Sequence, residues 1–168
     1  KINLIGRSTE SILWDRHIKE SFVIKYYIDK DEYPIIDLGT GAGFPGVILA
    51  MILKNDVYLV DANHKKTSFL NYVKTECNLS NVTIINSRIE DINNFPNNNI
   101  IVSRALATIN NIYNLTEFNK NNIYNIYIKG SKLYDEIKEA QKKWSFDYNI
   151  IESQNDMYLF ISSNIKAK

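Results

Sequence analysis

The stretch Asp37–Gly46, DLGTGAGFPG, decides the fold class of this chain. The short apolar run Pro34–Leu38 leads into it, and the apolar run Pro45–Leu53 follows it. A strand, a glycine-rich turn and a helix in this order let a ligand approach the backbone closely at a helix N-terminus. Proline is favoured in the first helical turn, so Pro45 fits the start of the helix. We predict a buried strand, a cofactor loop and a helix over these residues.

Short apolar runs and helical patterns alternate along the rest of the chain. Further strands are predicted at Val57–Asp61, Val82–Asn86, Asn99–Ser103 and Ile123–Ile128, and helices at Lys65–Cys77, Ala105–Leu115 and Leu133–Trp144. This alternation predicts a parallel, doubly wound sheet. The chain ends in two runs without a helix between them, Ser145–Glu152 and Met157–Ser163, which predict an antiparallel pair. The expected fold is α/β and Rossmann-like, a mostly parallel seven-stranded sheet with an antiparallel terminal strand, as in class I methyltransferases.

The length and the N-terminal pattern predict one domain with a helical extension. The 168 residues fit a domain of common size, so we expect a single domain over residues 1–168. Apolar residues at mixed helical spacing predict a helix over Thr9–Tyr27, within an N-terminal extension that covers residues 1–30. The asparagine-rich stretches Asn93–Asn99 and Asn119–Asn122 are predicted to be surface loops.

Composition and charge exclude several classes of protein. A net charge of +1 argues against a purely electrostatic nucleic-acid binder, so any such binding needs a local basic patch. The single cysteine, Cys77, allows neither an internal disulfide nor a cysteine-rich metal site, which predicts a cytoplasmic protein without a metal. The longest apolar run, about Val47–Leu53, is far shorter than the roughly 20 residues that span a bilayer. Cys77 is expected in the core, on one helical stripe with Phe69 and Val73.

The glycine loop by itself fits two cofactors. The segment Gly41–Gly46 matches the dinucleotide fingerprint, which predicts a nicotinamide-dependent oxidoreductase. Asp37, however, suits a ligand amino group and would repel a pyrophosphate. Asp61 ends the next strand about 20 residues after Gly39, near the spacing of a ribose-binding carboxylate. The loop is therefore predicted to bind S-adenosylmethionine, with Asp37, Gly39, Gly41 and Asp61 as candidate contacts.

Basic residues follow the ends of several predicted strands. The carboxyl ends of parallel strands meet at one edge of a sheet, where ligands bind. The basic residues at this edge are Lys65, Lys66, Arg88, Arg104 and Lys129. Together they predict a floor for a phosphate-bearing substrate, and Arg16 and His17 are further candidates for RNA binding. Ile89 and Glu90 are candidates for adenine contacts. The acidic pair Glu90 and Asp91 could instead stabilise the start of a helix through its dipole.

The residues after the fourth strand restrict the chemistry. Methylation of an exocyclic amine typically uses an Asn/Asp-Pro-Pro-aromatic segment there, whereas Val102–Ala105 contains no proline. Methylation of pyrimidine C5 needs a nucleophilic cysteine, and Cys77 is expected to be packed away. A purine ring nitrogen such as guanine N7 has an available lone pair and loses no proton, so positioning and desolvation suffice. No general base is expected.

These segments resemble the RsmG (GidB) family, the bacterial 16S rRNA guanine-N7 methyltransferases. The matching segments are Asn3-Leu4, Arg16-His17-Ile18 with Ser21, Asp37–Gly46, Leu59–Asp61 with Lys65-Lys66 and Phe69-Leu70, Asn81-Val82, Ser87–Glu90, Val102–Ala105 and Lys129-Gly130. The resemblance implies cofactor contacts at Gly39, Phe44, Ile89, Glu90 and Arg104, with Asp61 at the ribose, and a substrate side formed by Arg88, Arg104 and Lys129. It also implies a monomer that acts on 16S rRNA in the small ribosomal subunit.

The chain departs from the family pattern near its N-terminus. The family usually has further N-terminal helices, and it tends to have Ile-Leu-Asp-Ser where this chain has Ile18–Ser21. Ile5 stands where the family has threonine. These departures leave the cofactor loop intact and concern the docking of RNA. A non-catalytic RNA-binding module therefore remains an alternative beside the methyltransferase and the oxidoreductase.

Overall fold

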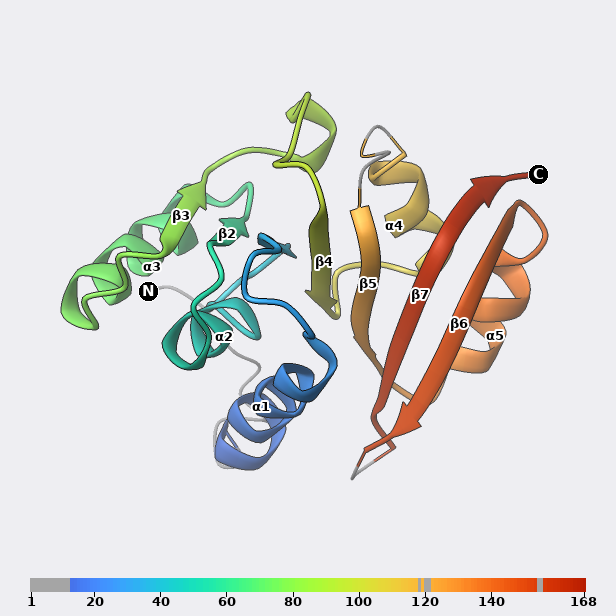
Figure 1. Cartoon of the computed structure of the whole chain (residues 1–168), viewed down its shortest axis with the longest axis horizontal. Coiled ribbons are helices and arrows are strands. Elements are labelled where there is room, and N and C mark those ends of the chain that lie inside the picture. The colour runs from blue at the N-terminus through green and yellow to red at the C-terminus, as the bar shows by residue number, and fades with distance from the viewer. Residues whose placement is uncertain (1–12, 118, 120–121, 154–155) are drawn as a thin grey trace.

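The computed structural model describes residues 13–117, 119, 122–153 and 156–168, apart from the side chains of Asp15 and Arg16. Its strands form one sheet in the order β3-β2-β1-β4-β5-β7-β6 (Figure 1). The strands are β1 (Ile35–Leu38), β2 (Val57–Val60), β3 (Val82–Ile85), β4 (Asn99–Arg104), β5 (Asn122–Lys129), β6 (Trp144–Glu152) and β7 (Tyr158–Ala167). Strands β1 to β5 pair in parallel, whereas β7 is antiparallel to both of its neighbours. The predicted α/β fold with an antiparallel end is confirmed.

Helices cover both faces of the sheet. They are α1 (Glu20–Ile24), α2 (Gly46–Ile52), α3 (His64–Glu76), α4 (Ile109–Leu115) and α5 (Leu133–Ala140). One apolar cluster joins residues of α1, α2 and α3 to the sheet, and a second joins α4 and α5 to alternate strand residues. Neighbouring residues of a strand point to opposite faces, so Ile35 lies in the first cluster and Ile36 in the second. The central strands are apolar on both faces for this reason.

The N-terminal segment is helical where the structure describes it, but it is not one regular α-helix. A π-helical turn, η2 (Trp14–Lys19), precedes α1, and a 3-10 turn, η3 (Lys25–Tyr27), follows it. Residues 9–12 of the predicted helix lie outside the described part of the chain. Ile24 of α1 is fully buried, which holds this segment against the sheet.

Two predicted helices are shorter than expected. Helix α4 begins only at Ile109, because Ala105 adopts a left-handed conformation with φ of 52° and the following residues form a loop. The Thr108 hydroxyl accepts the Asn111 N–H and caps α4. Helix α5 ends at Ala140, since Trp144 already belongs to β6.

Two predictions about individual side chains are wrong. Cys77 is exposed, because α3 ends at Glu76 and the chain turns at Asn78, where φ is 51°. Asn99 and Asn119, expected in surface loops, are buried and exchange two amide hydrogen bonds of 3.1 and 2.9 Å. Each amide satisfies the other, which removes the cost of burying them unpaired. In the described residues, no helix is long and apolar enough to cross a membrane.

Candidate functional site

The glycine loop follows β1 at the point where the strand order reverses. Strands β2 and β3 lie on one side of β1, and β4 and β5 lie on the other. Ligands of doubly wound sheets bind at this switch point, beyond the carboxyl ends of the strands. Gly41 has φ of 60°, and a Cβ there would approach only the Gly39 carbonyl at 3.8 Å and Lys66 Nζ at 4.0 Å. The loop is therefore open at Gly41, where a ligand can reach the backbone.

The Asp37 side chain holds this loop in place through hydrogen bonds. It is fully buried, and its Oδ2 accepts the Thr40 hydroxyl at 2.6 Å and the Gly46 N–H at 2.9 Å. Burial raises the pKa of Asp37 to about 7, against the opposing effects of these two donors and of the Arg104 charge. Its Oδ1 is buried and has no hydrogen-bond partner in the described part of the chain. The predicted cofactor residue is thus also the residue that ties the loop to α2.

Asp61 lies on the other side of the loop and joins it to β2. Its Oδ2 accepts the Gly41 N–H at 3.0 Å, and its Oδ1 accepts the Asn63 N–H at 2.8 Å. Lys66 Nζ lies 3.6 Å from Asp61 Oδ2. Asn63 caps α3 through the N–H groups of Lys65 and Lys66, so Asp61 is available to the loop. Sequence reasoning treated Lys66 as an RNA contact and missed this ion pair.

Phe44 connects three elements that are distant in sequence. Its ring lies 5.4 Å from the ring of His17 between centroids, and the Arg104 guanidinium lies 5.5 Å from the Phe44 centroid. His17 is buried and Arg104 is half-buried. The sequence could not place the N-terminal helix, whereas the structure brings His17 to the cofactor loop. The predicted RNA contact Arg16 has its side chain outside the described residues.

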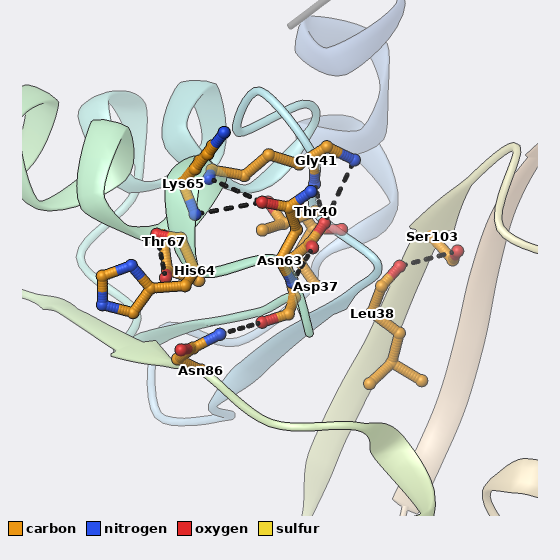
Figure 2. Close-up of polar contacts among 12 residues, drawn as sticks. Asp37, Leu38, Thr40, Gly41, Asn63, His64, Lys65, Thr67, Asn86 and Ser103 are labelled. Atoms are coloured by element: carbon orange, nitrogen blue, oxygen red, sulfur yellow. Dashed lines mark hydrogen bonds and ion pairs between the residues drawn. The ribbon is translucent and has the colours of Figure 1, made fainter. Parts of the chain in front are cut away.

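The end of β4 closes the site on the side opposite Asp61. The Ser103 hydroxyl donates to the Leu38 carbonyl at 3.0 Å, which joins β4 to β1 (Figure 2). The side chain of Leu106 covers Gly39 so closely that a Cβ on Gly39 would lie 2.5 Å from it. Leu106 is a site residue that the sequence analysis missed, because an apolar residue in a loop carries no signal of its own.

The residues after β3 are divided between the core and the surface. They form the 3-10 turn η4 (Ile89–Asp91), in which Ile89 is buried and Glu90 is exposed. Arg88, just before this turn, is exposed, as is Lys65 at the start of α3. These two basic side chains are open to a phosphate at the predicted edge of the sheet.

Lys129 does not join this exposed basic edge. Its side chain is only 6% exposed, and its Nζ lies 2.8 Å from Glu136 Oε2. Burial lowers the pKa of Lys129, and the Glu136 carboxylate opposes this effect. Lys129 lies at the expected strand end, but its charge is paired inside the protein, and its place on the substrate side stays a prediction. The described residues also hold no cluster of three acidic, histidine or cysteine side chains that could bind a metal ion.

Solved methyltransferases have this fold. A methyltransferase dependent on S-adenosylmethionine (SAM) from Aquifex aeolicus superposes with a TM-score of 0.69 at 18% identity, over 94% of this chain and 98% of that one. TrmK of M. capricolum, in complex with S-adenosylhomocysteine, gives a TM-score of 0.65 at 15% identity, over 86% of this chain and 67% of that one. At these identities the likeness shows the fold alone, which is the Rossmann-like fold of these methyltransferases.

Sequence relatives then identify the family. The GidB family model, described as rRNA small subunit methyltransferase G, matches residues 1–158. The ribosomal RNA small subunit methyltransferase G of Rickettsia prowazekii (strain Madrid E) is 38% identical over 152 residues, 90% of this chain and 78% of the relative. That of Magnetococcus marinus (strain ATCC BAA-1437 / JCM 17883 / MC-1) is 40% identical over 116 residues, 67% of this chain and 52% of the relative. The chain belongs to this family and is a SAM-dependent rRNA methyltransferase. The predicted family and cofactor are confirmed.

Proposed function

We propose that this enzyme methylates N7 of a guanine in 16S rRNA, within the small ribosomal subunit. The observation that carries the proposal is the end of β4, where Ser103 is bonded to Leu38 and Arg104 lies against Phe44. This segment has no proline and offers no carboxylate or amide to an exocyclic amine. Exposed Cys77 follows the end of α3 and, among the described residues, takes part in none of the hydrogen bonds or ring contacts of the loop. An acceptor that needs neither a base nor a nucleophile fits this site, and guanine N7 is such an acceptor.

The residues around the loop suit S-adenosylmethionine. Asp61 beside Gly41 can accept hydrogen bonds from ribose hydroxyls, and the open backbone at Gly41 admits the ligand. The unpartnered Oδ1 of buried Asp37 provides an acceptor below the loop for the amino group. Ile89 and Glu90 remain the candidates for the adenine, and Gly39 and Phe44 for the rest of the cofactor. When bound, the cofactor supplies a methyl group on a sulfonium, and its transfer to N7 leaves a neutral thioether and a cationic guanine.

The chain itself positions the acceptor base and excludes water. Phe44, with His17 on one side and Arg104 near it, offers an aromatic and cationic surface against which a base can stack. The exposed cations Arg88 and Lys65 are placed to bind phosphates of the RNA backbone. We place Arg104 next to the base, since it is half-buried at the end of β4. No residue has to remove a proton from N7.

Three further properties belong to the same proposal. The chain acts as one domain over residues 1–168, as a monomer and in the cytoplasm. Light scattering of the purified protein tests the monomer, and cell fractionation tests the compartment. The substrate is the small subunit rather than a protein or a small molecule, because the exposed basic residues suit a phosphate backbone.

The direct experiment follows methyl transfer to small subunits that lack the modification. The purified chain is incubated with labelled S-adenosylmethionine, and the modified nucleoside is identified by mass spectrometry. We expect one methyl group per subunit, on guanine N7. A methyl group on another atom or base would overturn the proposal. Binding to small subunits without any transfer would instead support the non-catalytic RNA-binding alternative.

A further inference from the structure

A buried ion pair lies behind the substrate side of the site. Lys129 ends β5, and Glu136 lies in the first turn of α5. The two side chains are 6% and 19% exposed, and their charged atoms are 2.8 Å apart. Burying two charges is costly and does not by itself stabilise a fold. The pair therefore calls for an explanation beyond stability.

Both members of the pair also hold the loop that leads from β4 to α4. Lys129 Nζ donates to the Ala107 carbonyl at 2.5 Å, and Glu136 Oε2 accepts the Ile109 N–H at 3.1 Å. The Ile109 N–H is at the first turn of α4, where backbone donors have no partner within the helix. One ion pair thus binds the loop at two points and satisfies groups that would otherwise be unsatisfied.

This loop carries residues of the site. It begins after Arg104, and its Leu106 covers Gly39 of the cofactor loop. Ala105 is left-handed, with φ of 52°, a conformation that costs energy for any residue with a Cβ. Such a conformation persists when surrounding contacts impose it. The contacts at Ala107 and Ile109 lie directly after the strained residue and are suited to this task.

We propose that Lys129 and Glu136 form a clamp that positions the Arg104–Thr108 segment for methyl transfer. The inference rests on the proposed function, because it concerns the same site. Lys129 acts through the loop and does not touch the RNA. A cation that binds phosphate must reach solvent, and Lys129 has both a carboxylate and a carbonyl as partners inside the protein. Glu136 is then as important for the reaction as Lys129.

A double-mutant cycle separates the clamp from a substrate contact. The variants are Lys129→Gln, Glu136→Gln and the two combined, and the measurement is kcat and KM on small subunits at saturating cofactor. The clamp predicts that each single change lowers kcat by about tenfold or more. The kcat of the double variant should be no lower than that of the less active single variant, as expected for residues in direct contact. If Glu136→Gln keeps wild-type activity while Lys129→Gln loses it, the clamp is wrong and Lys129 contacts the substrate.

The same helix offers a matched control. Glu139 and Lys142 form an exposed ion pair of 2.6 Å on and just after α5, and in the described part of the chain their side chains hydrogen-bond only to each other. Glu139→Gln and Lys142→Gln should leave kcat unchanged, since exposed pairs contribute little. A loss of activity in these variants equal to that of Glu136→Gln would show a general effect of charge on α5 and overturn the proposal.

Hydrogen exchange gives a readout that does not depend on activity. In the clamp, Lys129→Gln should speed exchange of the Ile109 amide while the amides of β1 stay protected, because Glu136 loses its fixed position. Unchanged exchange at Ile109 would overturn the clamp even if the enzyme were inactive.

Where a single variant unfolds, Lys129→Met with Glu136→Leu removes both charges together and is expected to fold. The same faster exchange at Ile109 is expected for it. If the wild-type chain methylates no RNA, the proposed function fails, yet exchange still tests the clamp.

Discussion

At the scale of single residues, the two carboxylates beside the loop have different surroundings and different roles. Asp37 is fully buried and bonded to Thr40 and Gly46, whereas Asp61 is 9% exposed and accepts the Gly41 N–H. Burial raises the pKa of the Asp37 carboxyl group. Asp37 therefore ties the loop to α2, while Asp61 ties it to the end of β2.

Asp37 should make the stability of the protein depend on pH. Its pKa is raised from the ordinary value of 3.8 to about 7, so the folded state binds more protons than the unfolded state between these values. Stability is then lost as pH rises through this window, by up to about 4 kcal/mol for a shift of this size. In Asp37→Asn this contribution disappears, so the free energy of unfolding should fall less between about pH 4 and pH 7. Urea unfolding at a series of pH values measures both slopes; equal slopes would contradict the assignment.

Asp61 should determine how tightly the protein binds the cofactor when no RNA is present. Asp61→Asn keeps the shape of the side chain and removes the charge. A hydrogen bond to a charged group contributes about 1.5–3 kcal/mol, and one between neutral groups contributes about 0.5–1.5 kcal/mol. We expect the Kd for S-adenosylhomocysteine, measured by calorimetry, to rise about 10- to 100-fold. Asp56→Asn is the control, because Asp56 is exposed and precedes β2 at the far end of the strand. An unchanged Kd in Asp61→Asn would exclude Asp61 from the ribose site.

At the scale of elements, the site depends on how closely α2 approaches the sheet. The Gly46 N–H reaches Asp37, and a Cβ on Gly46 would overlap the side chain of Leu59 and lie 2.7 Å from Asp37 Oδ2. Helix α2 can lie this near to β1 and β2 only without a side chain at that position. In the same loop, the ring of Phe44 contacts His17 and Arg104. The loop thus couples the N-terminal helices to the end of β4.

A methyl group at Gly46 should separate helix and sheet. Gly46→Ala forces Leu59 or the Asp37 carboxylate to move, and overpacking of this kind costs about 1–3 kcal/mol. We expect a lower free energy of unfolding and weaker cofactor binding together. Gly130→Ala is the matched control, since nothing lies within 4 Å of its Cβ position. Equal stability of the two variants would show that the close approach at Gly46 is not required.

At the scale of the whole molecule, the charge distribution matters more than its sum. The net charge is +1, yet exposed cations lie at the carboxyl edge, where Lys65 and Arg88 follow β2 and β3. Lys129, which the strand order places at the same edge, is neutralised by Glu136. Of these three cations, the exposed ones therefore lie toward the β2–β3 side of the sheet.

Salt dependence should reveal which cations bind RNA phosphates. Each phosphate contact contributes about 0.7–0.9 to the slope of log affinity against log salt concentration. Lys65→Gln and Arg88→Gln should each reduce this slope for small-subunit binding by about that amount and leave cofactor affinity unchanged. Lys138→Gln, an exposed change on α5, should alter neither quantity. Equal slopes for all three variants and the wild type would place the RNA elsewhere.

The sequence by itself determined the order of the elements and the class of cofactor. Apolar runs at strand spacing, the stretch Asp37–Gly46 and the absence of a helix between the last two runs were sufficient for the α/β sheet with its antiparallel end. These features are local, so they can be recognised along the chain. The predicted start of α4 was wrong because the left-handed conformation falls on Ala105, and only a glycine there would have indicated a turn.

Only the tertiary structure decided which charged side chains are exposed and which are paired inside the protein. Strand order predicted the edge on which Lys129 lies, but its partner Glu136 comes from a helix whose rotation the sequence does not specify. The exposed Cys77, the buried Asn99 and the contact of His17 with Phe44 have the same cause. Pairing and burial depend on residues that are distant in the chain, and the glycine loop acquires its open side at Gly41 only when β1, α2 and Asp61 surround it.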